Sequence, residues 1–186
     1  MKRTLVLTAF ACAVLLNVAF AEAPSPAEPI LLTSCGQSAD VLMMKTLLAR
    51  DSLHFVYLPQ ATYADLAGAG SVIIVLGGSS KGLGAAKISE TEETARVTAL
   101  LDSARAKDVP VLAVHMGGLN RRGALSDPFN RIGAAAAVRI IVVKGGNDDG
   151  FFAAIAAENS ARLDTVDNAL LVGPLVKAIF RPAAGE

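Results

Sequence analysis

The chain has 186 residues, of which 17 are basic and 17 acidic, so its formal net charge is zero. This length is typical of a single domain. The balanced charge argues against nucleic acid as a partner, because proteins that bind nucleic acid normally carry a basic surface.

The first 21 residues have the pattern of a secretory signal peptide. Lys2 and Arg3 precede an apolar run over residues 5–16, and Ala19 and Ala21 are small at the positions that signal peptidase reads. The run is shorter than the about 20 residues that a membrane span needs. We therefore expect cleavage after Ala21, export to the periplasm or the cell exterior, and no membrane span after cleavage.

The segment predicted to be removed holds two basic residues and no acid, so the mature chain carries a slight negative charge. Cys35 is then its single cysteine, and its place at the end of an apolar strand favours burial. We expect a Pro-rich, extended and mobile leader over 22–29, one domain over 30–181 and a C-terminal tail over 182–186.

Short apolar runs alternate with helical patterns along the predicted domain. The run 71–76 is apolar on both faces, which is typical of a central parallel strand. Ser89 and Glu92 form a capping box, which predicts that the helix after this strand begins there. The strands are predicted at 30–33, 53–58, 71–76, 111–114 and 138–143, with a sixth left open at 162–166; the helices are predicted at 38–49, from 89 to about 107, from 127, at 151–158 and up to about 180, with a short helix or turn at 62–66.

Strand–helix alternation predicts an α/β fold. Right-handed crossovers then give a three-layer, doubly wound sandwich. We expect a mostly parallel sheet of five or six strands in the flavodoxin-like, or Rossmann-like, order 2-1-3-4-5.

Polar and Gly-rich segments follow four of the predicted strands. In open parallel sheets, ligands bind outside the carboxyl ends of the strands, so these segments are expected to meet at one edge. Glycine allows backbone amides to approach a ligand, and three basic side chains add positive charge. The alternative is ordinary turn chemistry. The candidate ligand-binding residues are Ser34, Gln37, Ser38, Gly78, Ser79, Ser80, Lys81, His115, Arg121, Arg122 and Asn147.

Three motifs in these segments partly match the sequence patterns of known sites. Residues 78–82 match G-x-S-x-G, but a nucleophile elbow needs a helix at once, and the helix signal waits until Ser89. The same loop lacks the Walker order and the third glycine of the dinucleotide pattern, so we expect no nucleotide cofactor. Asn147, Asp148 and Asp149 lack the spacing of a calcium loop, and helix capping explains Asp149. We expect no metal.

His115 ends a predicted buried strand at the ligand edge. It is a candidate catalytic base or a hydrogen-bond donor to a ligand. The alternative, weighted equally, is a structural histidine whose ring nitrogens hydrogen-bond to neighbouring backbone groups.

The loop motifs resemble an exported bacterial α/β family catalogued as domain of unknown function 6305. Cys35 departs from that pattern, where a small residue such as Ala is expected, which makes a catalytic thiol less plausible. The family's name assigns no activity, so the resemblance implies a coherent site and no particular ligand. The matching segments are LLTSCGQSAD at 31–40, GGSSKGLG at 77–84, VHMGG at 114–118, RRGALSDPF at 121–129 and GNDDGFF at 146–152.

The leading hypothesis is an exported protein that binds a small polar or anionic molecule at the carboxyl edge of the sheet. Serine and glutamine side chains and Lys81 would supply hydrogen bonds, and Arg121 or Arg122 the charge. A second hypothesis is a hydrolase-like enzyme with His115 as base and Asp127 or Asp148 as its partner. A third is an envelope accessory protein that docks to another protein and uses no small ligand.

Overall fold

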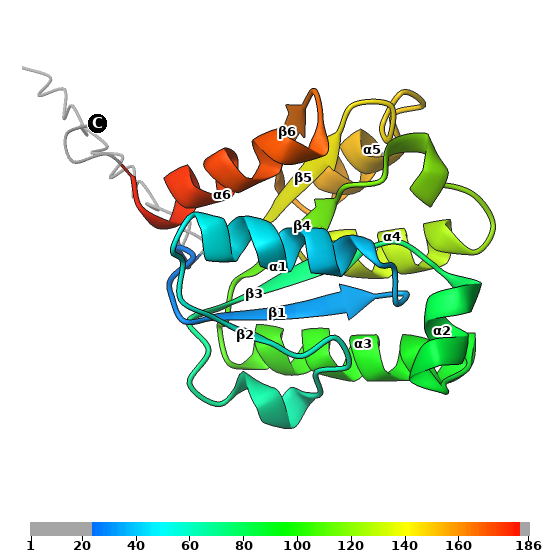
Figure 1. The fold of residues 1–186 in the computed structure, drawn as a ribbon, viewed down its shortest axis with the longest axis horizontal. Helices are drawn as coiled ribbons and strands as arrows, with labels where there is room; N and C mark the ends of the chain where they lie inside the picture. The colour runs from blue at the N-terminus through cyan, green and yellow to red at the C-terminus, as the bar shows by residue number, and fades with distance from the viewer. Residues whose placement is uncertain (1–23, 183–186) are drawn as a thin grey trace, which may run out of the picture.

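The computed structural model describes residues 24–182, so the predicted signal segment and residues 183–186 of the predicted tail lie outside the described residues. Six parallel strands form one sheet in the order β2-β1-β3-β4-β5-β6 (Figure 1). This confirms the predicted α/β class and strand order and places the sixth strand at the end of the sheet. The strands are β1 (Ile30–Cys35), β2 (Phe55–Tyr57), β3 (Ser71–Leu76), β4 (Val111–His115), β5 (Arg139–Val143) and β6 (Arg162–Val166).

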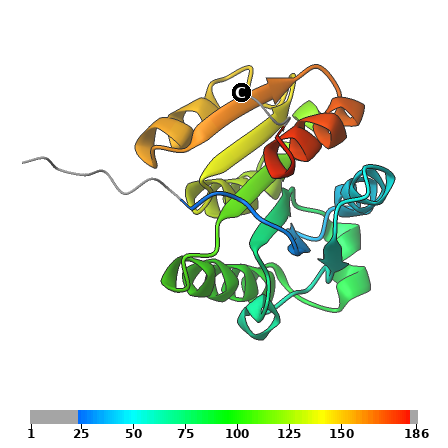
Figure 2. The same ribbon diagram turned by 90° about the vertical axis from the view of Figure 1, so that its left-hand side faces the viewer.

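Helices cover both faces of the sheet (Figure 2). Because successive side chains of a strand point to opposite faces, β3 gives Ile73 and Val75 to one core layer and Val72, Ile74 and Leu76 to the other. The first layer is completed by α1 (Asp40–Arg50) and α6 (Val172–Phe180), and the second by α3 (Glu90–Ala106), α4 (Ser126–Ala135) and α5 (Phe151–Glu158). The remaining elements are α2 (Ser80–Ala86) and the 3₁₀ turns η1 (Tyr63–Leu66), η2 (Gly118–Arg121) and η3 (Ala169–Leu171).

The edge strand β2 is shorter than the predicted run 53–58. It pairs only with β1, from Ile30 opposite Phe55 to Leu32 opposite Tyr57. Leu53 instead closes the end of α1, because its N–H donates to Leu48 O at 3.1 Å. The apolar side chain of Leu53 therefore reflects packing after a helix and not strand pairing.

Helix α2 was not predicted, since glycine at two of its positions lowers helix propensity. Ser79 caps it by accepting a hydrogen bond from Gly82 N at 3.1 Å. Leu83 is buried in the core and anchors it. The expectation that helical structure waits until Ser89 is therefore wrong, although Ser89 does cap α3 with the predicted capping box.

The last residues of the predicted mobile leader are fixed to the domain. Ala27 O accepts from Ser71 Oγ at 2.7 Å, and Pro29 O accepts from Gly70 N at 2.8 Å. The Glu28 carboxylate pairs with Arg181 at 2.9 Å, which joins the two ends of the domain. Within residues 24–182, no helix has both the length and the apolar character to cross a membrane.

Candidate functional site

The turns after β1 and β3 meet at the carboxyl edge of the sheet, as predicted. Gln37 and Gly78 form an antiparallel bridge across them. Ser79 N donates to Gly36 O at 2.9 Å. Gly36 and Gln37 both have positive φ, of 97° and 58°, so the turn after β1 is tight and strained at Gln37. The two loops therefore form one connected surface.

A buried ion pair, which was not predicted from the sequence, stabilises the turn after β1. The carboxylate of Glu93 in α3 is fully buried and accepts from Gly36 N at 2.9 Å and from Gln37 Nε2 at 3.0 Å. Arg96 pairs with Glu93 at 2.8 Å and donates to Ser34 O at 2.6 Å. A signal existed: Glu93 lies four and seven residues before Val97 and Leu100, on the apolar face of the same helix.

A groove of about 460 Å³ opens between the start of α1, the segment after β2, and α2. It lies at the switch point of the sheet, because β1 has β2 on one side and β3 on the other. Ligands of doubly wound sheets bind at this point. The lining residues are Gln37, Ser38, Ala39, Val41, Leu42, Tyr57, Pro59, Gln60, Ser79, Lys81, Gly82, Ala85 and Ala86.

Among the residues that the structure describes, Lys81 is the one charged side chain that lines the groove, and no carboxylate lines it. It is exposed, and it takes part in none of the ion pairs formed within residues 24–182. An ammonium with no protein partner beside a concave surface can pair with an anionic ligand. Four predicted residues, Gln37, Ser38, Ser79 and Lys81, are thus brought together in this groove.

The two predicted arginines are paired within the protein instead. Arg121 Nε lies 3.0 Å from Asp40 Oδ2. Arg122 lies 2.7 Å from Asp127 and 2.9 Å from Asp149, and it also donates to Gly146 O at 2.6 Å. The hydrogen bonds from Arg122 lower the pKa of Asp149 to about 2. The charge that both guanidinium groups were expected to offer a ligand is therefore balanced by carboxylates of the chain.

His115 ends β4 as predicted, but its ring is fully buried. Nε2 lies 3.0 Å from Arg121 O, and the ring centroid lies 4.8 Å from that of Phe152. Gly146 packs so closely on the ring that a Cβ there would come within 2.7 Å of Nδ1. The arrangement matches the alternative of a histidine held by backbone in part: Nε2 has a backbone partner, Nδ1 has none within the described chain, and His115 does not line the groove.

Burial lowers the pKa of His115, and the nearby Arg122 charge adds to the effect; Arg121 O, Asp40 and Asp127 oppose it. The unfolded chain, with a histidine pKa of about 6.5, then binds more protons than the folded one below that pH. Stability is therefore fully present above about pH 6.5 and is lost as the pH falls through the folded pKa. Asp149, with a pKa of about 2, titrates below this window.

We predict that His115→Gln flattens the fall in unfolding free energy as the pH drops below about 6.5. Urea denaturation at steps across this range measures it. His54→Gln, at the exposed histidine before β2, is the matched control and should keep the wild-type slope. An unchanged slope in His115→Gln would contradict the assignment of the acid sensitivity to this buried ring.

The other predicted residues serve the fold. Asn147 Oδ1 accepts from Phe152 N at 2.7 Å and from Ala153 N at 3.1 Å, so it caps α5. Asp149 also accepts from Phe151 N at 3.2 Å, which confirms the predicted capping role. Gly78 N donates to Ser126 Oγ at 3.1 Å.

Three buried side-chain polar atoms have no partner within the described chain: Ser34 Oγ, His115 Nδ1 and Asn130 Oδ1.

The G-x-S-x-G motif has the immediate helix that the sequence analysis found missing, because α2 begins at Ser80. Ser80 is not among the residues with positive φ, so the turn lacks the strain of a nucleophile elbow. His115 is enclosed and bonded to Arg121 O. Burial also raises the pKa of the Cys35 thiol, which points to Phe129 O at 3.1 Å. Within residues 24–182, neither Ser80 nor Cys35 is therefore paired with His115 as an activated nucleophile.

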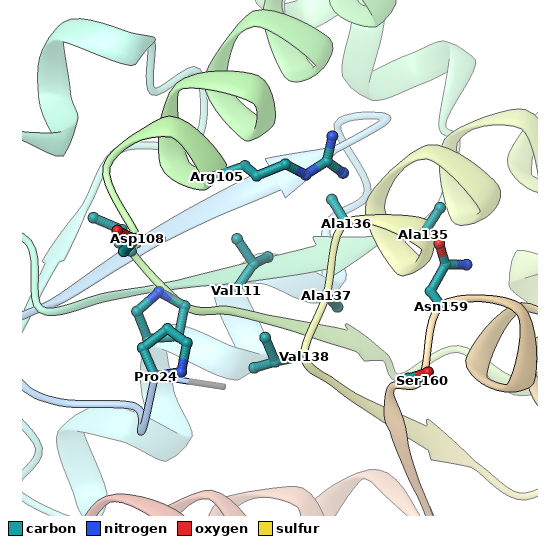
Figure 3. Close-up of a pocket in the computed structure, with 12 residues that line it drawn as sticks. Pro24, Arg105, Asp108, Val111, Ala135, Ala136, Ala137, Val138, Asn159 and Ser160 are labelled. Carbon is teal, nitrogen blue, oxygen red and sulfur yellow. The ribbon is translucent and has the colours of Figure 1, made fainter. Parts of the chain in front are cut away.

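A second hollow of about 420 Å³ lies at the opposite edge of the sheet, at the amino ends of β4 and β5 (Figure 3). Arg105, Asn159 and a run of alanines over 135–137 contribute to its walls. Arg105 already lies 3.8 Å from Asp102. This edge is not where parallel sheets bind ligands, so the groove at the switch point is the stronger candidate.

The family model "Domain of unknown function (DUF6305)" matches residues 27–180. The chain belongs to this family. The DUF6305 match includes both walls of the groove, and it begins at Ala27, where the leader first bonds to the domain. No curated protein matches the chain.

Among solved structures, the chain is similar to AlinE4, an SGNH-hydrolase family esterase, and to two of its mutants. The identities are 12–14%, 89% of this chain and 88% of those chains are covered, and the TM-scores are 0.32 and 0.33. At these values the likeness carries no inference about activity.

Proposed function

We propose that this member of the DUF6305 family binds a small polar or anionic molecule in the groove at the switch point. The observation that carries the proposal is Lys81, an unpaired ammonium on a groove without carboxylates. Gln37, Ser38 and Ser79 line the same space. A volume of about 460 Å³ falls in the usual range for small-molecule sites.

Thermal denaturation with carboxylates, phosphates and sugars tests the proposal. A ligand at a hundredfold excess over its Kd stabilises the protein by about 2.7 kcal/mol. We expect at least one class to raise the melting temperature without being converted. Lys81→Ala should weaken the binding of that ligand by at least about tenfold, since charged hydrogen bonds contribute roughly 1.5–3 kcal/mol.

Lys107→Ala is the matched control. It removes the same charge from an exposed lysine after the end of α3, at the opposite edge of the sheet. Its ligand affinity should equal that of the wild type. Stabilisation by no ligand of the panel, or equal binding by Lys81→Ala and the wild type, would overturn the proposal.

We further propose that the protein acts outside the cytoplasm after loss of residues 1–21. The support is the order of basic start, apolar run and small residues at the cleavage site. The intact mass of the protein from the envelope and medium fractions should correspond to a chain that begins at Glu22. A mass that retains Met1 would contradict this proposal.

A further inference from the structure

The charge of the groove fits a ligand with a single negative charge. Among the described residues, Lys81 is the one cation that lines the groove, and Lys45 lies beside it with Nζ 4.9 Å from the ring centroid of Tyr57. Arg121 and Arg122 are held by Asp40, Asp127 and Asp149. Phosphate groups are commonly recognised by several donors, with arginine forks prominent among them. A lone lysine ammonium is instead a compact point charge, which suits a monoanion such as a carboxylate.

Two hydroxyl groups in the groove have a proton left to donate. Ser38 Oγ accepts from Asp40 N at 3.2 Å, and Ser79 Oγ accepts from Gly82 N at 3.1 Å. Within the described chain neither hydroxyl donates to a protein acceptor. Ser79 is half-buried and can donate to a ligand, whereas Ser38 is only 1% exposed. A hydroxyl donor and an ammonium complement a carboxylate, which accepts hydrogen bonds and donates none.

Gln37 does not add a donor to this set. Both protons of its amide nitrogen are used, one on Pro59 O at 3.1 Å and one on Glu93 at 3.0 Å. Among the described groove side chains, the accessible free donors are therefore Lys81, Ser79, the Tyr57 hydroxyl and Gln60.

The rest of the groove wall is apolar. Leu42 keeps 52% of its surface exposed, and Tyr57 presents a ring that carries Lys45 Nζ at 4.9 Å from its centroid. A sugar or an inorganic anion would leave this wall in water, whereas an alkyl or aryl group would cover it. The remaining apolar lining consists of Ala39, Val41, Pro59, Ala85 and Ala86.

We infer that the groove binds an amphipathic monocarboxylate, with the carboxylate at Lys81 and an alkyl or aryl group on Leu42 and Tyr57. This inference rests on the proposed function, since it names the class of ligand for the same groove. It is carried by the combination of one unpaired cation in the groove lining, the free Ser79 hydroxyl and a mainly apolar wall.

Calorimetric titration with matched probes tests the inference. Phenylacetate has both features, phenylacetamide lacks the charge, acetate lacks the ring, and inorganic phosphate and glucose represent other classes. We expect phenylacetate to bind at least tenfold more tightly than each of the others. Lys81→Ala should remove its preference over phenylacetamide, and Leu42→Ser should reduce its preference over acetate several-fold.

Two control variants separate these effects from general damage. Lys107→Ala, at the opposite edge, and Met43→Ser, an exposed residue of α1 that does not line the groove, should bind phenylacetate as the wild type does. Lys81-dependent binding of phosphate or glucose in place of phenylacetate would overturn the inference and leave the proposed function standing. Absence of Lys81-dependent binding for every probe would overturn both.

Discussion

Replacing Glu93 with alanine is expected to lower the free energy of unfolding by roughly 3–5 kcal/mol, the usual effect of removing one partner from a buried ion pair. The carboxylate is fully buried, and Arg96, 2.8 Å away, has a side chain that is only 12% exposed. Its removal leaves that guanidinium unpaired and takes the acceptor from Gly36 N and Gln37 Nε2. Equilibrium denaturation in urea measures the change.

Glu90→Ala is the control for this prediction. Glu90 lies in the first turn of the same helix and is exposed, so its loss removes only a favourable interaction with the helix dipole, about 0.3–1 kcal/mol. If the two variants were equally stable, the ion pair would not be the support of the turn after β1.

The second large effect is expected for Gly82→Ala. A Cβ at Gly82 would lie only 1.9 Å from the backbone oxygen of Gln37. Because the clash is with backbone, no change of side-chain rotamer can relieve it. We expect a loss of about 1–3 kcal/mol, as for overpacked cores. Because Gly82 lines the groove, the displaced turn should also weaken ligand binding.

Gly84→Ala provides a matched control two residues further along α2. A Cβ there meets no atom within 4 Å. Alanine is a better helix former than glycine, so this variant should gain about 0.5–1 kcal/mol. Opposite signs for the two variants in urea denaturation support the close contact between α2 and the turn after β1. A loss in both would show that α2 tolerates no change at either position.

Much of the fold could be predicted from the sequence because its strands are strongly apolar. The buried strand β3 reads as an almost continuous apolar run, and β1 begins with three apolar residues. Their alternation with helices predicts the α/β class, for which the observed strand order is the common one. Helix α2 escaped prediction because its stability comes from the Ser79 cap and the burial of Leu83, while its own propensity is low. Tertiary contacts outweighed local preference there.

The position of the candidate groove was predictable from the sequence, but the pairing of the charged side chains around it was not. Loops after parallel strands must meet at one edge, which brought Gln37 and Gly78 together. The pairing of Arg121 with Asp40 joins residues far apart in the chain and leaves no local pattern. The enclosure of His115 likewise depends on Gly146 and Phe152 from other segments. Because Arg121 and Arg122 are paired with carboxylates, Lys81 is the groove cation that remains available to a ligand.

We propose that the ligand binds in the groove at the switch point. Amide chemical shifts of the ¹⁵N-labelled protein, titrated with phenylacetate, test it most directly. We expect the largest changes in amide chemical shift at the groove residues Ser38, Ser79, Lys81 and Gly82. Largest shifts at Arg105 and Asn159, in the hollow at the opposite edge, or no shifts at all, would contradict it.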